Sequence, residues 1–105
     1  MSYNASKSST SAETIMHFLE LYDPNMTVED VPGIGPASVA SLKQKGYATI
    51  QALLGLFLIG VKEHSTMEDV CQTFYNELKK MCKANCHTVT FAIAHLADQK
   101  RLFEY

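Results

Sequence analysis

The sequence lacks an uncharged apolar run of about 18 residues, which excludes a membrane-spanning helix and predicts no membrane insertion. Its polar N-terminus, Met1 to Ser11, has no apolar core, so we expect no secretory signal. Cysteine is scarce, and an odd number of three without an export signal favours reduced thiols over a disulfide framework. Charge is nearly balanced at −2, so the whole chain gives no polybasic signature for nucleic acid or acidic membranes. We therefore expect a protein of the cytosol and nucleus that is not secreted.

The 105 residues, of which 47% are hydrophobic and 19% charged, are typical of one globular domain. This composition excludes a disordered chain, a collagen-like repeat and a multidomain enzyme. A domain of this size has modest stability unless subunits associate, so we expect subunits to associate. Period-two alternation is missing throughout, which predicts an all-α fold, a compact bundle of short helices without internal repeats.

Capping and periodicity divide the chain into short helices. Residues 1–10 are small and polar, which predicts a flexible tail ahead of a single helical domain over 11–105. The expected helices cover about 11–22, one turn after Thr27, 36–45, 50–61, 66–83 and a last segment from Thr88. Capping boxes are expected at Thr10 and Ser65, an N-cap at Thr49, a left-handed C-terminal cap at Gly46, and a cap at the end of the 66–83 helix at Asn85.

The segment Val28 to Gly46 has the form of a helix-hairpin-helix. Gly33 and Gly35 permit backbone dihedrals closed to other residues and let the main chain approach a phosphate. Ile34 between them is expected to plug the core, while amides at Gly35 and the next helix N-terminus point outward. Such a phosphate grip reads no bases, so it predicts binding to double-stranded DNA without sequence preference. The residues expected at the DNA from this segment are Gly33, Ile34, Gly35, Ala37, Ser38, Lys43 and Lys45.

Local charge favours this interpretation. Between Val31 and Lys62 there are three lysines and no acidic residue, so this block is basic within an acidic protein. The alternative is that the glycine pair forms only a tight turn between two helices, as helix-hairpin-helix units also do in structural roles.

The sequence gives little support for a metal site or for an enzyme active site. Cys82, Cys86, His87 and His95 lie close in sequence, but no Cys-x-x-Cys pair exists and buried thiols are common in helical cores, so we predict no metal and no cofactor. No Ser/His/Asp set, carboxylate pair or phosphate loop stands out, so we predict that the protein is not an enzyme.

Several segments together resemble the barrier-to-autointegration factor family, small all-helical homodimers of eukaryotic nuclei. The resemblance spans about residues 11 to 103. It rests on Phe18, Pro24, Gly33-Ile34-Gly35, Leu42, Gly46, Leu54-Gly55-Leu56-Phe57-Leu58, Phe74, Leu78, Cys82 and Ala84-Asn85.

The resemblance implies a SAM-like fold in which each subunit grips DNA through its hairpin and the N-terminus of the last helix, here Asn85 and His87. Two subunits facing opposite ways then bridge two DNA segments, which implies DNA compaction or organisation of chromatin or the nuclear envelope. The expected location is accordingly nuclear and cytoplasmic, associated with chromatin.

The resemblance also implies protein partners and a switch. A hydrophobic groove for LEM-domain proteins, with lamins as further partners, would lie around Tyr47, Gly55, Phe57 and Ile59. Phosphorylation at Ser9, Thr10 and Ser11 would release DNA, because added phosphate beside a DNA-binding face repels phosphate.

The sequence also departs from the family pattern. The region Glu63 to Asp69 is longer, tryptophan is absent, and Thr14, His87 and Thr90 stand where the family has basic residues. Fewer charge contacts predict weaker and less salt-sensitive DNA binding. The alternative function is a helical protein-interaction adaptor that kept the dimer and lost DNA binding.

Overall fold

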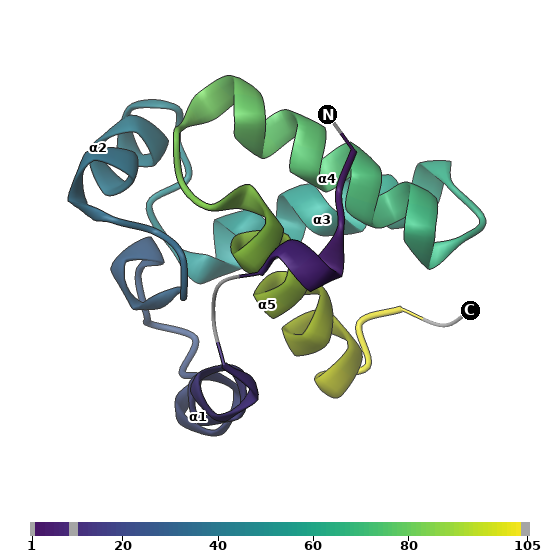
Figure 1. The fold of residues 1–105 in the computed structure, drawn as a ribbon, viewed down its shortest axis with the longest axis horizontal. Coiled ribbons are helices and arrows are strands. Elements are labelled where there is room, and N and C mark those ends of the chain that lie inside the picture. Colours follow the sequence, from purple (N-terminus) through teal and green to yellow (C-terminus); the bar gives the residue numbers. More distant parts are fainter. Residues whose placement is uncertain (1, 9–10, 104–105) are drawn as a thin grey trace.

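The computed structural model describes residues 2–8 and 11–103, and the fold there is all-α (Figure 1). No named strand occurs in these residues; one isolated antiparallel bridge joins Thr27 to Thr49. The α-helices are α1 (Ala12–Leu21), α2 (Pro36–Gln44), α3 (Ile50–Glu63), α4 (Met67–Met81) and α5 (Cys86–Gln99), with 3₁₀ turns η1 (Ala5–Lys7) and η2 (Val28–Asp30). The predicted fold class is confirmed, and the helix ends differ from the expected ones by only a few residues.

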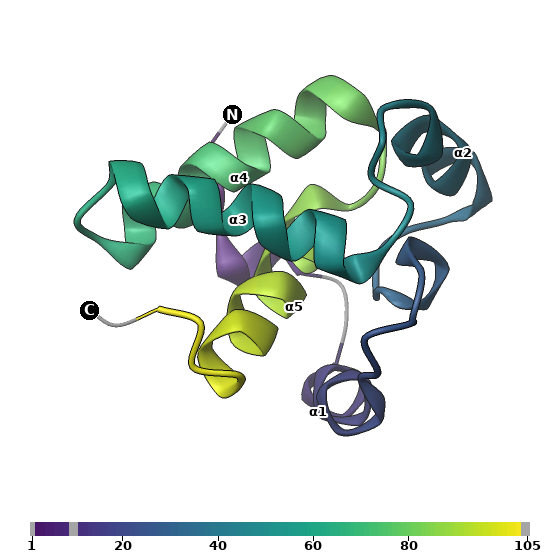
Figure 2. The same ribbon diagram turned by 180° about the vertical axis from the view of Figure 1, so that it is seen from behind.

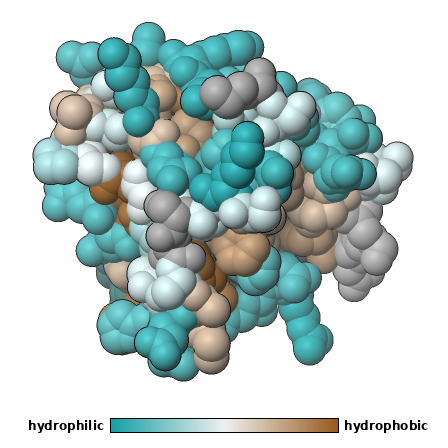
Figure 3. Space-filling view, in the orientation of Figure 1, coloured by the Kyte–Doolittle hydropathy of each residue, from teal (hydrophilic) through white to brown (hydrophobic). Residues whose placement is uncertain are grey.

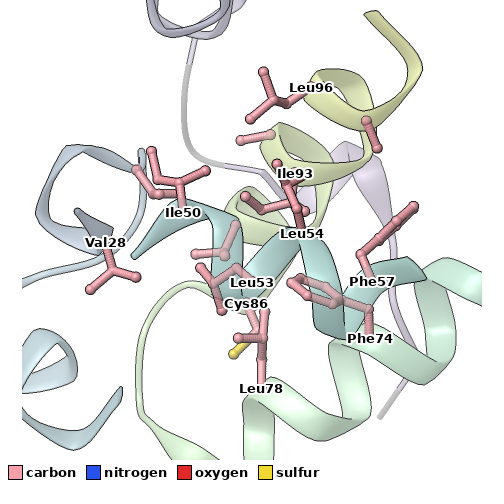
Figure 4. Close-up of a cluster of buried hydrophobic side chains, with 14 of the residues drawn as sticks. Val28, Ile50, Leu53, Leu54, Phe57, Phe74, Leu78, Cys86, Ile93 and Leu96 are labelled. Atoms are coloured by element: carbon pink, nitrogen blue, oxygen red, sulfur yellow. The ribbon is translucent and has the colours of Figure 1, made fainter. Parts of the chain in front are cut away.

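The core is built around α3, whose sequence is apolar on more than one face. This helix packs against α4 and α5 (Figure 2). Phe57 lies edge-on to Phe74 of α4, with ring centroids 5.6 Å apart, and Ile93 and Leu96 of α5 are fully buried in the same cluster (Figure 4). Such packing stabilises helices that are too short to be stable alone.

The hairpin unit is closed at its base by two backbone hydrogen bonds. Val28 donates to the Ala48 carbonyl at 3.1 Å, and Ile50 donates to the Met26 carbonyl at 3.3 Å. Gly46 ends α2 with a φ of +90°, as predicted for a left-handed cap. The segment from η2 through α2 is therefore fixed as one unit beside the central helices.

Four of the helices have an N-cap side chain whose oxygen accepts the backbone N–H of the residue three positions further along the chain. These N-cap residues are Ser11, Thr49, Thr66 and Asn85. Thr49 is as predicted. Thr66 takes the place expected for Ser65, and Ser11 caps α1, while Thr10 lies outside the described residues. The prediction that Asn85 ends the preceding helix is wrong: it begins α5, because its side chain accepts the Thr88 N–H at 3.2 Å, so α5 begins at Cys86 rather than at Thr88.

Residues 2–8 lie against α4 and α5, which corrects the expectation of a tail for this part of the chain (Figure 1). The Tyr3 N–H donates to Gln72 Oε1 at 2.8 Å and the Tyr3 ring lies beside Tyr75. Burial raises the pKa of Tyr3 to about 12. Tyr3 therefore supplies an apolar contact that the otherwise polar composition of residues 2–8 does not predict.

Candidate nucleic-acid interface

Gly33 joins the hairpin to the start of α5. Its φ is +94°, and its carbonyl accepts the Asn85 N–H at 3.2 Å. A Cβ at Gly33 would lie 3.0 Å from Thr88 Cβ, so a side chain has no room. Gly35, by contrast, has an ordinary φ of −94°, and a Cβ there would meet none of the described atoms within 4 Å. The prediction of two special glycine conformations is therefore correct for Gly33 and wrong for Gly35.

Two helix N-termini meet at this contact. Within residues 2–8 and 11–103, no acceptor binds the N–H groups of Gly35, Ala37 or Ser38 at the start of α2, nor those of Cys86 and His87 at the start of α5. Amides at a helix start carry the positive end of the helix dipole and suit an anionic ligand. The Gly33–Asn85 hydrogen bond therefore places two donor groups beside each other.

The side chains around these amides differ from expectation. Ile34 packs against the core as expected but is only half-buried, because it also lines a shallow surface pocket with Glu29 and Val39. The Ser38 side chain is buried and hydrogen bonds to Cys82, so Ser38 offers its backbone rather than its hydroxyl.

The lysines singled out in the sequence are not the ones nearest the amides. Lys43 forms an ion pair with Glu29 at 3.5 Å. Lys45 follows the other end of α2, about 15 Å from Gly35 at 1.5 Å per helical residue. Lys62 lies in the last turn of α3, next to the α3–α4 loop and on the opposite side of the molecule from α2 (Figure 1).

Three other lysines gather beside the start of α2, at the C-terminal end of α4. A pocket of about 310 Å³ separates the two helices and is lined by Ala37, Ser38, Ser41, Lys79, Lys80, Met81, Cys82 and Lys83. Lys80 pairs with Glu77 at 3.3 Å, whereas the structure shows no carboxylate within ion-pair distance of Lys79 or Lys83 among the residues it describes. The surface over this end of α4 is mostly hydrophilic (Figure 3). We call Lys79, Lys80 and Lys83 the α4 lysine cluster.

Sequence reasoning missed the α4 lysine cluster because the C-terminal part of the chain is slightly acidic when averaged. The available signal was the spacing of Lys79 and Lys83, four residues apart at the end of an expected helix.

The family model for barrier to autointegration factor matches residues 9–103. This chain belongs to that family. The match covers nearly the whole chain, agrees with a SAM-like fold, and supports a DNA-binding, non-enzymatic role of the general kind found in barrier-to-autointegration factor. No curated protein and no solved structure matches the chain.

Thr14, His87 and Thr90 stand at the three positions where barrier-to-autointegration factor has basic residues, and they differ in exposure. Thr90 is fully buried with an unpartnered Oγ1 among the described residues, so it does not reach the surface. Thr14 is exposed, 3.0 Å from the Ser11 hydroxyl. His87 is packed between Tyr75 and Tyr3, and its Nδ1 accepts the Asn4 N–H at 3.1 Å.

The charge near His87 comes from its neighbours. Burial, Lys7 and Lys79 all lower the pKa of His87, which favours the neutral ring that accepts the Asn4 N–H. Lys7 and Lys79 thus stand near the start of α5 in place of a basic residue at this family position.

The expected partner groove of barrier-to-autointegration factor is only partly present as a surface. Tyr47 is half-buried, Gly55 is exposed and Ile59 is 55% exposed. Phe57 is fully buried against Phe74 and does not contribute to the groove, which corrects its assignment. Gly60 packs against Val70 of α4, so close helix approach explains that glycine but not Gly55.

The structure also describes part of the expected phosphorylation segment and the surroundings of the possible metal ligands. Of the phosphorylation candidates, Ser11 is exposed, and Ser9 and Thr10 lie outside the described residues. In the part of the chain that the structure describes, no three His, Cys, Asp or Glu side chains gather to hold a metal. None of the helices there is both long and apolar enough to cross a membrane.

Proposed function

We propose that this protein binds double-stranded DNA without sequence preference and bridges two DNA segments as a homodimer. The observation that carries the proposal is the Gly33–Asn85 hydrogen bond next to the α4 lysine cluster. This bond joins two helix starts whose first amides have no acceptor among the residues that the structure describes. In a cell, such bridging would compact DNA or organise chromatin at the nuclear envelope.

Phosphate oxygens of the DNA backbone are the acceptors that suit this site. The amides of Gly35 and Ala37 would donate to one phosphate, and Lys79 and Lys83 would neutralise others nearby. Main-chain donors and flexible lysines contact the sugar-phosphate backbone equally well in every sequence. The chemistry of the site therefore favours non-specific binding.

Bridging requires a second grip that faces another way, which a symmetric dimer supplies. The outer face of α3, the helix that lies in front in Figure 2, offers a surface for the second copy. Ile59 is a large exposed apolar side chain on this helix, and Gly55 leaves room for close approach. We propose this face as the contact between subunits or with a LEM-domain protein.

Charge reversal of the α4 lysine cluster tests the DNA surface. We expect the double substitution Lys79→Glu and Lys83→Glu to weaken duplex binding by about tenfold or more and to reduce the slope of log affinity against log salt by about 2. The matched control, Lys62→Glu with Lys100→Glu, changes net charge equally but leaves the lysine cluster intact. Fluorescence anisotropy that showed the same loss for both variants would assign the effect to bulk charge and reject this surface.

Substitution of Gly55 tests the α3 face. We expect Gly55→Glu to convert a dimer into a monomer in analytical ultracentrifugation, because it places a charge in an apolar contact. Gln44→Glu, at an exposed position on α2, serves as the control. A Gly55→Glu protein that remained dimeric and still bound LEM-domain peptide would show that this face makes neither contact.

A further inference from the structure

We propose that Cys82 and Cys86 form a dithiol site that reacts with hydrogen peroxide and closes to an intramolecular disulfide at the junction of α4 and α5. Neither thiol is a DNA contact in the surface proposed above, to which Cys86 contributes only its backbone N–H.

The fold brings the two thiols together. Cys82 follows the last residue of α4 in an extended conformation, and Cys86 is the first residue of α5. The two thiols are close enough that each shifts the pKa of the other, and the Cys86 thiol donates to the Ala84 carbonyl at 3.4 Å. The Cys86 sulfur points into the space near Leu78 and Leu53 (Figure 4). Only three residues separate the cysteines, so the bond needs a small rearrangement of one short link.

Cys82 is the thiol that small reagents can reach. It is 8% exposed and lines the 310 Å³ pocket beside the α4 lysine cluster, whereas Cys86 is 2% exposed and lies deeper. Thiolates at such electropositive positions are the reactive form of cysteine. Hydrogen bonds, first from Cys86 and then from the Ala84 backbone and Ser38, lower the pKa of Cys82, while the hydrogen bond with Cys82 raises the pKa of Cys86.

The third cysteine provides an internal comparison. Cys71 is buried within α4, and burial raises its pKa to about 11. It lines none of the pockets described above, and an unreactive thiol is expected there.

The reaction balances with peroxide as the oxidant. The Cys82 thiolate attacks one peroxide oxygen; an S–O bond forms, the O–O bond breaks, and the departing hydroxide takes a proton to become water. The Cys86 sulfur then attacks the sulfenic sulfur of Cys82, forming the S–S bond and breaking the S–O bond. The second hydroxide leaves with the Cys86 proton as water. Two thiols are oxidised and one peroxide is reduced to two waters.

Peptide mapping of the full-length protein tests this directly. Reduced protein is treated with hydrogen peroxide, alkylated, and digested with trypsin without reductant. Because Lys83 separates the cysteines, the disulfide would join the peptides 81–83 and 84–100, while Cys71 lies in the peptide 63–79. We expect the joined pair, a loss of two hydrogen atoms from the intact mass, full reversal by dithiothreitol, and an alkylated Cys71.

Two variants sharpen the result. Cys86→Ser should leave a Cys82 sulfenic acid that dimedone traps, and Cys71→Ser should form the disulfide as the unchanged protein does. Three results with folded protein would overturn the proposal. Cys82 and Cys86 could both be alkylated after the peroxide treatment, which would show that neither had been oxidised; Cys71 could react first; or the disulfide could link two chains. Circular dichroism of each sample distinguishes these outcomes from unfolding.

Discussion

Gly35→Glu is expected to lower the affinity for duplex DNA at least about 100-fold, because a like charge at a phosphate contact costs several kcal/mol. Gly35 has an ordinary φ of −94°, and a Cβ added there meets none of the described atoms within 4 Å, so the larger residue fits without strain. We therefore expect the free energy of unfolding to change by no more than about 0.5 kcal/mol. Anisotropy with a random-sequence duplex and urea unfolding measure the two quantities.

Gly35→Ala is the control for that experiment. It keeps the backbone amide and adds one methyl group without charge, so we expect binding close to that of the unchanged protein. A folded Gly35→Glu protein with unchanged affinity would mean that the hairpin is a structural turn, and would favour the adaptor function.

Gly33→Ala is expected to destabilise the fold by about 1–3 kcal/mol, because the left-handed φ is strained for alanine and its Cβ would press on Thr88. The Cβ would also lie 3.2 Å from the Asn85 carbonyl, next to the bond that joins the hairpin to α5. Urea unfolding reports the loss, and we expect DNA binding to weaken with it.

Gly46→Ala isolates the strain from the contact. Gly46 has a similar φ of +90°, but a Cβ there meets nothing within 4 Å in the described structure. We expect Gly46→Ala to destabilise the fold less than Gly33→Ala. Equal losses would show that the Thr88 contact contributes nothing and that the hairpin is not tightly docked on α5.

Local signals in the sequence were sufficient for the fold. Thr49 predicts the start of α3, Pro36 the start of α2 and Gly46 its end, because capping and backbone conformation depend on a few neighbouring residues. The ambiguity at Asn85 shows the limit of such signals. A polar residue between two helices suits the end of one or the start of the next, and the Thr88 amide decides which.

The site was harder to predict because it is built from distant segments. The hairpin amides were evident from Gly33 and Gly35, but their positive surroundings come from Lys79 and Lys83, more than 40 positions later. Averaging charge along the chain favours Lys62, which lies in the last turn of α3. That end of α3 lies on the opposite side of the molecule from α2 (Figure 1). Likewise, Phe57 was assigned to a groove by resemblance, although its burial depends on which face of α3 meets α4.

The most direct test of the central claim is a titration of a short random-sequence DNA duplex with the unchanged protein, followed by fluorescence anisotropy at several salt concentrations. We predict micromolar or tighter binding that does not depend on sequence and that weakens steadily as salt rises. An absence of binding at low salt by protein that is folded and dimeric would contradict the account and indicate a protein-interaction role.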